Sequence, residues 1–133
     1  MYALRRRKRA VSVSRAVAAV TPGLSGVPNV AALETAQDRL LEKNLFQELG
    51  IPTPPFAPID SLEQLSAAAI RIGFPTVLKT RRMGYDGKGQ VVIRDESSLD
   101  GAWKRLSGSP LLVEKYVAFQ HELSVIGVRD TAG

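Results

Sequence analysis

The sequence contains FPTVLKT (74–80), RRMGYDGKG (81–89) and QVVIR (90–94) in direct succession. The first and last segments are rich in β-branched residues and predict two strands. The middle segment is rich in glycine and charge and predicts the loop that joins them. This stretch therefore predicts a strand–loop–strand unit, around which the rest of the chain can be interpreted.

The loop combines glycines with positive charge. Glycine adopts backbone conformations that other residues avoid, so successive backbone N–H groups can converge on an anion. The glycines are Gly84, Gly87 and Gly89, and the cations of the stretch are Lys79, Arg81, Arg82 and Lys88. A strand follows the last glycine, which excludes the Walker and Rossmann phosphate loops, because both of those open a helix. We interpret the loop as a phosphate-binding flap, with an ordinary glycine-rich hairpin turn as the alternative.

Three charged side chains on the predicted strands could serve a ligand under such a flap. Lys79 interrupts an otherwise uncharged strand directly before the loop, Glu114 lies within the apolar run LLVEKYV, and Glu122 begins the next predicted strand. A lysine on rigid structure can be aimed at phosphates, and a carboxylate near a nucleotide can accept ribose hydroxyls. The alternatives are an edge-strand lysine that discourages aggregation and glutamates that strand alternation points to solvent.

The sequence before the flap predicts a helix and an extended segment. Residues 31–49 place apolar side chains at three- and four-residue steps, and Gly50 ends the predicted helix. On the residues alone, Arg39 is assigned to the solvated face of this helix. Residues 51–58 contain four prolines and are predicted to be extended.

Further capping signals and apolar runs complete the predicted fold. Ser61 and Gln64 form a capping box for a second helix, which Gly73 is predicted to end. Ser97 is predicted to cap a third helix, whose apolar stripe includes Trp103. Residues 111–117 and 122–130 predict two more strands. The elements alternate irregularly rather than as repeated strand–helix units, which predicts an α+β fold.

Charge is distributed unevenly along the 133 residues. The formal net charge is +5, but residues 1–33 hold six cations and no acidic residue, and the remaining hundred residues carry a net charge of −1. The body of the chain thus has no excess of positive charge, which argues against a globally basic nucleic-acid-binding domain. The basic head could be a nuclear signal, a nucleic-acid patch or a transit peptide, and we interpret it as a disordered extension or as sequence foreign to the domain.

The composition excludes several other classes. The chain has no cysteine and one histidine, which excludes a disulfide scaffold, a Cys-ligated zinc site, a thiol nucleophile and a His-rich metal site. No apolar run approaches the roughly 20 residues that a membrane-spanning helix needs. A hydrophobic content of 44% is enough to form a core.

Three stretches of the sequence resemble a known family. AQDRLLEKNLFQELGIPTPPF, FPTVLKTRRMGYDGKGQVVI and LLVEKYVAFQHELSVIGVRD are similar to the ATP-grasp region of the 5-(carboxyamino)imidazole ribonucleotide synthases. The resemblance covers roughly residues 31–133 and implies an ATP-grasp lid subdomain with partial flanking subdomains. It implies a basic head over 1–30, a partial N-terminal part over 31–75, the lid with its flap over 76–117, and the start of a C-terminal subdomain over 118–133.

The resemblance implies a ligase reaction in purine (IMP) biosynthesis. ATP phosphorylates bicarbonate to carboxyphosphate, which carboxylates 5-aminoimidazole ribonucleotide, and Mg²⁺ bridges the phosphates. It implies a cytoplasmic and usually homodimeric enzyme, with neither nucleic acid nor membrane as a partner.

The resemblance also implies residue roles. Arg39 matches a nucleotide-site arginine, Lys79 matches the lysine on the α- and β-phosphates, and Glu122 matches the ribose-binding carboxylate. The hinge that edges the adenine matches Glu114, Lys115, Tyr116 and Val117. The phosphate flap matches Gly84, Tyr85, Asp86, Gly87, Lys88, Gly89 and Gln90.

The chain also departs from the family pattern. The family's preceding α/β domain with its G-x-G-Q-L-G turn is replaced here by the unrelated basic head over residues 1–30, and no cluster of acidic residues matches the magnesium ligands. We therefore assign no catalytic residue and no metal ligand within the chain, and we expect a fragment that is inactive on its own. The alternatives are a nucleotide-binding remnant without catalysis, or another ATP-grasp carboxylase or ligase.

Overall fold

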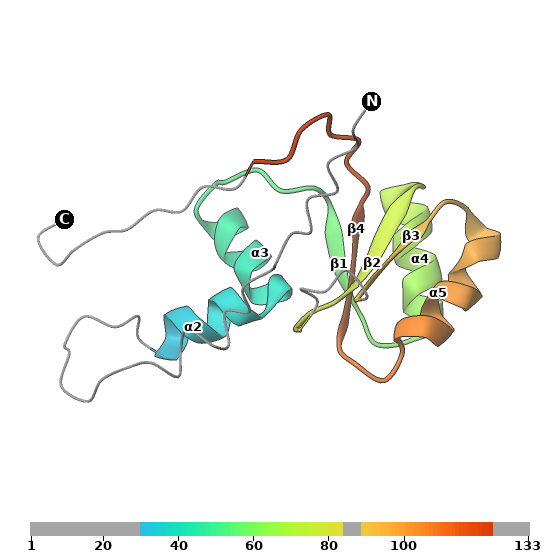
Figure 1. Ribbon diagram of the computed structural model, residues 1–133, viewed down its shortest axis with the longest axis horizontal. Helices are drawn as coiled ribbons and strands as arrows, with labels where there is room; N and C mark the ends of the chain where they lie inside the picture. Colours follow the sequence, from blue (N-terminus) through green and yellow to red (C-terminus); the bar gives the residue numbers. More distant parts are fainter. Residues whose placement is uncertain (1–29, 84–88, 124–133) are drawn as a thin grey trace, which may run out of the picture.

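The computed structural model describes residues 30–83 and 89–123. These residues form a four-stranded sheet with helices on both sides (Figure 1), which confirms the α+β prediction. The strands are β1 (Phe56–Ile59), β2 (Thr76–Thr80), β3 (Gln90–Ile93) and β4 (Leu111–Lys115). The helices are α2 (Val30–Gln37), α3 (Arg39–Glu48), α4 (Leu62–Ile72) and α5 (Leu99–Leu106), with a 3₁₀ turn η2 (Glu96–Ser98). No helix in the described part of the chain is long and apolar enough to span a bilayer.

The sheet has the strand order β1-β4-β2-β3, and every neighbouring pair is antiparallel. Leu78 on β2 lies opposite Val113 on β4, and Val77 lies opposite Glu114. Because successive side chains of a strand point to opposite faces, Leu78 and Val113 share one face, and Val77 and Glu114 share the other.

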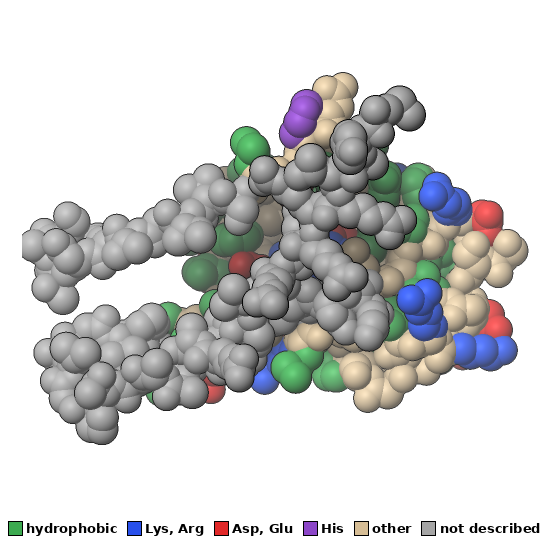
Figure 2. All heavy atoms as spheres, viewed as in Figure 1, with side chains coloured by type: hydrophobic (Ala, Val, Ile, Leu, Met, Phe, Trp, Pro, Cys, Tyr) green, Lys and Arg blue, Asp and Glu red, His purple; other side chains and the backbone are tan. Residues whose placement is uncertain are grey.

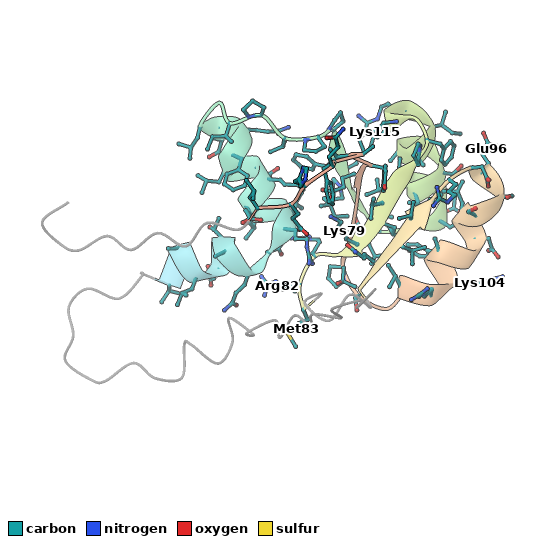
Figure 3. All side chains as sticks on the ribbon, turned by 45° about the horizontal axis from the view of Figure 1, so that its top comes forward. Lys79, Arg82, Met83, Glu96, Lys104 and Lys115 are labelled. Carbon is teal, nitrogen blue, oxygen red and sulfur yellow. The ribbon has the colours of Figure 1, made fainter. Side chains whose placement is uncertain are left out.

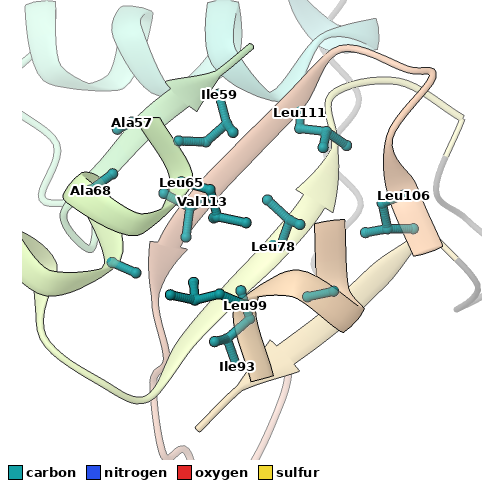
Figure 4. Close-up of a cluster of buried hydrophobic side chains, with 12 residues drawn as sticks. Ala57, Ile59, Leu65, Ala68, Leu78, Ile93, Leu99, Leu106, Leu111 and Val113 are labelled. Carbon is teal, nitrogen blue, oxygen red and sulfur yellow. The ribbon is translucent and has the colours of Figure 1, made fainter. Parts of the chain in front are cut away.

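The first face forms the hydrophobic core (Figure 4). It packs against α4 and α5, which lie together on this side of the sheet in Figure 1. Leu65 of α4 and Leu78 and Val113 of the sheet are completely buried. The core residues are Ala57, Ile59, Leu65, Ala68, Ala69, Leu78, Ile93, Leu99, Ala102, Leu106, Leu111 and Val113.

The boundaries of α4 follow the predicted signals. The Ser61 hydroxyl oxygen accepts a hydrogen bond from the Gln64 backbone N–H at 3.2 Å, as expected for an N-cap residue. The Gln64 side chain accepts in return from the backbone N–H of Asp60, one residue before the cap. Gly73 ends the helix with φ of 83°, a conformation that glycine adopts without strain.

The prediction that Ser97 caps the third helix is wrong. The N-cap residue of α5 is Ser98, whose side chain makes no capping bond, and Asp95 caps the preceding turn η2. The Asp95 carboxylate accepts from the Ser98 backbone N–H and from the hydroxyls of Ser97 and Ser98. These bonds order the 3₁₀ turn η2, and α5 then begins at Leu99. Trp103 packs against the core from α5, as its place in the apolar stripe predicts.

The single helix predicted over 31–49 is also wrong. The chain breaks at Asp38, whose backbone is extended (φ −123°, ψ 112°) and whose carboxylate caps α3 by accepting from the Leu40 N–H at 3.0 Å. No residue of α3 is fully buried, so its leucines do not form a buried stripe. Leu41, Leu45 and Leu49 remain between 38% and 63% exposed.

The segment predicted to be extended over 51–58 contains most of β1, a strand that was not predicted because of the prolines. β1 pairs only with β4 and lies at the sheet edge, which is where strands tolerate proline. The sheet therefore joins residues on both sides of the predicted boundary between 75 and 76. The strand predicted over 122–130 lies largely outside the described residues, and Glu122 and Leu123 have no regular secondary structure.

Candidate functional site

The second face of the sheet carries a pocket of about 300 Å³. Its walls come from β2, β3 and β4 and from the segment that follows β4. Seven predicted site residues line it: Lys79, Gln90, Glu114 and Lys115 from the strands, then Tyr116, Val117 and Glu122. Lys79 lies near the middle of the sheet in Figure 3, and Lys115 lies farther along it. Residues distant in the sequence thus converge on one site.

Glu114 is the central charged group of this face. Strand alternation places it on the pocket side, and it is only 8% exposed. Its Oε1 accepts from the Lys79 ammonium, and its Oε2 lies 2.7 Å from the Lys43 ammonium. Burial raises the pKa of Glu114, but the hydrogen bonds from Lys43 and Lys79 outweigh it and hold the pKa below its ordinary range. Glu114 is therefore an ionised carboxylate between two cations.

Lys43 is a site residue that the sequence analysis missed. It reaches Glu114 from α3, and its Nζ also lies 5.4 Å from the centre of the Phe56 ring, within cation–π range. Phe56 is the β1 residue directly opposite Glu114 in the sheet register. The only sequence signal is the spacing of four residues from Arg39, which places both side chains on one face of the helix.

Lys79 lies on an interior strand, because β2 has β4 on one side and β3 on the other. The alternative interpretation of Lys79 as an edge-strand lysine is therefore wrong. Its side chain is 23% exposed and forms part of the pocket wall. The ammonium group is thus held at the boundary between Glu114 and the open pocket.

A second charged cluster joins α3 to the end of β2. Arg81 donates to both carboxylate oxygens of Asp38, from Nε at 2.9 Å and from a terminal nitrogen at 2.7 Å. Arg82 Nε donates to Asp38 Oδ2 at 3.2 Å. Asp38 is 3% exposed, and burial raises its pKa. Hydrogen bonds from Arg81, the Leu40 N–H and Arg82 outweigh burial and lower the pKa overall.

Arg39 takes part in the same junction. Its guanidinium donates to the Thr80 carbonyl at 2.6 Å, and its backbone N–H donates to the Arg81 carbonyl at 3.0 Å. Its assignment to a solvated helix face is therefore wrong, although it does not line the pocket. Arg39 and Asp38 together fix α3 against the strand that carries Lys79.

The described part of the flap is its base. The Thr80 N–H donates to the Gly89 carbonyl at 2.9 Å, and Gln90 opens β3 directly opposite Lys79. The remaining flap residues predicted for the site lie outside the described residues; they are Gly84, Tyr85, Asp86, Gly87 and Lys88.

The predicted hinge consists of the last two residues of β4 and the two residues that follow it. The Lys115 ammonium donates to the carbonyls of Gly73 and Phe74 at 2.8 and 3.1 Å, and the Tyr116 N–H donates to the Pro75 carbonyl at 3.2 Å. Val117 is about half exposed at the pocket wall. The hinge is therefore attached to the turn before β2, beside the pocket.

The described residues offer no metal centre. Over 30–83 and 89–123, no three His, Cys, Asp or Glu side chains converge where they could hold an ion. Glu114 already has two ammonium partners. These residues therefore do not fit the magnesium ion that the resemblance implies.

Comparisons with known proteins agree with this geometry. Residues 44–133 match the family model of the ATP-grasp domain. The N5-carboxyaminoimidazole ribonucleotide synthase of Pseudomonas aeruginosa is 48% identical over 106 residues, which cover 80% of this chain and 29% of that protein. The chain thus matches less than a third of this relative's length.

The chain is also similar to solved structures of synthetases of the same kind. The N5-carboxyaminoimidazole ribonucleotide synthetase of Thermus thermophilus is 47% identical with a TM-score of 0.62, over 70% of this chain and 24% of that one. The N5-carboxyaminoimidazole synthetase of Staphylococcus aureus complexed with ADP is 38% identical with a TM-score of 0.59, over 65% and 23%. The chain belongs to the ATP-grasp family.

Proposed function

We propose that this chain forms part of the ATP-binding region of a ligase that carboxylates 5-aminoimidazole ribonucleotide with bicarbonate. One observation carries the proposal: Lys79, Glu114, the hinge and Glu122 line a single pocket. The 48% identity to the synthase of Pseudomonas aeruginosa supports the choice of substrate. The ADP complex of the Staphylococcus aureus relative supports the choice of nucleotide.

The lining of the pocket suits the parts of ATP. Lys79 supplies an ammonium group for charge-assisted contacts with the phosphates. The hinge offers backbone groups for a planar base, and Val77 of β2 and Val92 of β3 offer apolar surfaces. Glu122 offers a carboxylate that can accept ribose hydroxyls. In this arrangement the chain binds and orients the nucleotide.

The similarity to the N5-carboxyaminoimidazole ribonucleotide synthases supports the proposed reaction. The γ-phosphoryl group of ATP is transferred to a bicarbonate oxygen, which yields ADP and carboxyphosphate. The amine of 5-aminoimidazole ribonucleotide then attacks the carboxyl carbon, and phosphate leaves. The described residues contribute positioning and electrostatics, which supply most of the catalysis of phosphoryl transfer.

Nucleotide binding by the chain tests the first part of the proposal. We expect calorimetry to detect ADP and ATP binding, and Lys79→Ala to weaken it by about tenfold or more, because a charge-assisted phosphate contact is lost. Lys104→Ala is the matched control, because Lys104 is a helical lysine paired with a carboxylate far from the pocket. Equal binding by wild type and Lys79→Ala would contradict the role of Lys79.

A chimera tests the reaction itself. The matched segment of the Pseudomonas aeruginosa synthase is replaced by the corresponding segment of this chain. We expect ATP consumption that depends on both bicarbonate and 5-aminoimidazole ribonucleotide. A chimera that binds ATP but consumes it only with a different amine would indicate another ATP-grasp carboxylase. One that binds ATP without any turnover would indicate a nucleotide-binding remnant.

A further inference from the structure

The charges around Glu114 pose a problem for the proposed role of Lys79. The Lys79 ammonium is hydrogen-bonded to Glu114, so it is already neutralised by a buried carboxylate. To bind a phosphate in the pocket, the ammonium must move away from this partner. A buried carboxylate left without a partner is strongly unfavourable. Release of Lys79 therefore requires a second cation that stays with Glu114.

Lys43 occupies the position that such a cation needs. It contacts Glu114 Oε2, the oxygen that Lys79 does not use, at 2.7 Å. Lys79 and Glu114 line the pocket, whereas Lys43 approaches from α3 and does not. A phosphate group in the pocket would thus meet Lys79 and leave Lys43 in place.

The surroundings of Lys43 hold it to this position. Its side chain is 14% exposed, compared with 23% for Lys79. The Phe56 ring adds a second attraction that keeps the Lys43 ammonium beside β1. The helix that carries Lys43 is itself anchored to β2 through Asp38 and Arg81.

We propose that Lys43 is a positioning residue of the pocket, which holds the Glu114 carboxylate so that Lys79 can leave it and bind the phosphates of the nucleotide. The inference deepens the proposed function and rests on it for the identity of the ligand. With two cations and one carboxylate, the cluster carries one net positive charge for an anionic ligand. Lys43 itself does not touch the nucleotide.

The first experiment needs no nucleotide. The carboxyl carbon of Glu114 is titrated by ¹³C NMR in the wild-type chain and in Lys43→Met. We expect the pKa of Glu114 to rise in Lys43→Met and to remain unchanged in the control Lys104→Met. An unchanged Glu114 pKa in Lys43→Met would overturn the assignment. Should Lys43→Met fail to fold, Lys43→Gln provides the same test, because it also removes the charge.

The second experiment measures ADP binding calorimetrically in buffers of different ionisation enthalpy. In Lys43→Met we expect affinity to fall about tenfold or more, which is about 1.4 kcal/mol or more. We also expect a proton to be taken up on binding, because Glu114 becomes protonated when Lys79 leaves it. Lys43→Arg should restore both properties toward those of the wild type. A merely structural role for Lys43 would lower affinity without proton uptake.

The two experiments separate this inference from the proposed function. If wild type fails to bind ADP, the proposed function and the release of Lys79 are both overturned, and the NMR titration still decides whether Lys43 holds Glu114. If wild type binds ADP and Lys43→Met binds equally well without proton uptake, the proposed function stands and the role of Lys43 is overturned.

Discussion

The two faces of the sheet differ in composition although the same strands build both. On the face covered by α4 and α5, Leu78 and Val113 are fully buried among apolar neighbours. On the opposite face, the next residues along the chain, Lys79 and Glu114, form a charged cluster beside a pocket. Strand alternation therefore separates a face that stabilises the fold from a face that can bind a ligand, one residue apart.

The largest loss of stability is expected from a substitution on the apolar face. Leu78→Ala removes a completely buried side chain from the centre of the core (Figure 4). We expect a loss of about 2–5 kcal/mol in the free energy of unfolding, from lost burial and the cavity left behind. Urea denaturation measures it. A loss below about 1 kcal/mol would show that the core of Figure 4 does not determine stability.

Lowering the pH should reduce the stability of the fold through two carboxylates, Glu114 and Asp38, on the opposite side of the sheet. The folded-state pKa values of Glu114 and Asp38 lie below their ordinary values of 4.5 and 3.8. The unfolded chain therefore binds these protons first, and stability present above pH 5 is lost as pH falls through the folded-state values. Denaturation midpoints between pH 7 and pH 3 measure this loss.

Two variants test whether Glu114 and Asp38 cause the loss of stability at low pH. Glu114→Gln and Asp38→Asn should each flatten the dependence of stability on pH between pH 5 and pH 3. Glu63 and Asp95 also have lowered pKa values, from hydrogen bonds at exposed positions, so they provide a background that both variants retain. An unchanged pH dependence in both variants would contradict the buried-charge account.

The junction between α3 and β2 should contribute more to the free energy of unfolding than an ordinary helix cap does. Asp38 caps α3 and also pairs with two arginines, whereas Ser61 caps α4 by accepting from the Gln64 N–H. We expect Asp38→Ala to cost about 2–3 kcal/mol and Ser61→Ala to cost about 1 kcal/mol. Denaturation of the two variants gives the comparison. Equal losses would show that the arginine contacts add nothing to stability.

The smallest loss of stability is expected from a substitution at the surface. Lys104 pairs with Asp100 at 2.6 Å on α5, where both side chains are more than half exposed. Figure 2 shows cationic and acidic side chains interspersed at that end of the molecule. We expect Lys104→Ala to cost about 0.3–0.5 kcal/mol, because solvent screens such pairs. A larger loss by urea denaturation would show that exposed ion pairs matter as much as buried ones here.

The sequence predicted the elements that carry local signals. The strands around the flap, the Ser61 cap and the end of α4 at Gly73 followed from residue type and spacing alone. The break at Asp38 was not predictable in this way, because the contacts that hold it come from Arg81 and Arg82, more than 40 residues later. Likewise, β1 depends on its pairing with β4.

The site was predictable to the extent that its residues lie in recognisable motifs. Lys79, Glu114 and Glu122 were candidates because they are charged residues on predicted strands, and the resemblance added the other hinge residues, 115–117. Lys43 gave no such signal, because a lysine on a polar helix is ordinarily solvated. Its contact with Glu114 depends on the docking of α3, which the local sequence does not specify.

The most direct test of the account is to map ADP binding onto the two faces by NMR. We predict that ADP shifts the signals of the pocket face, above all the Lys79 ammonium and the backbone amides of 115–117. The signals of Leu78 and Val113 and of the α5 helix should change little. Shifts confined to the α4 and α5 side, or no shifts at millimolar ADP, would contradict the claim that the charged face binds the nucleotide.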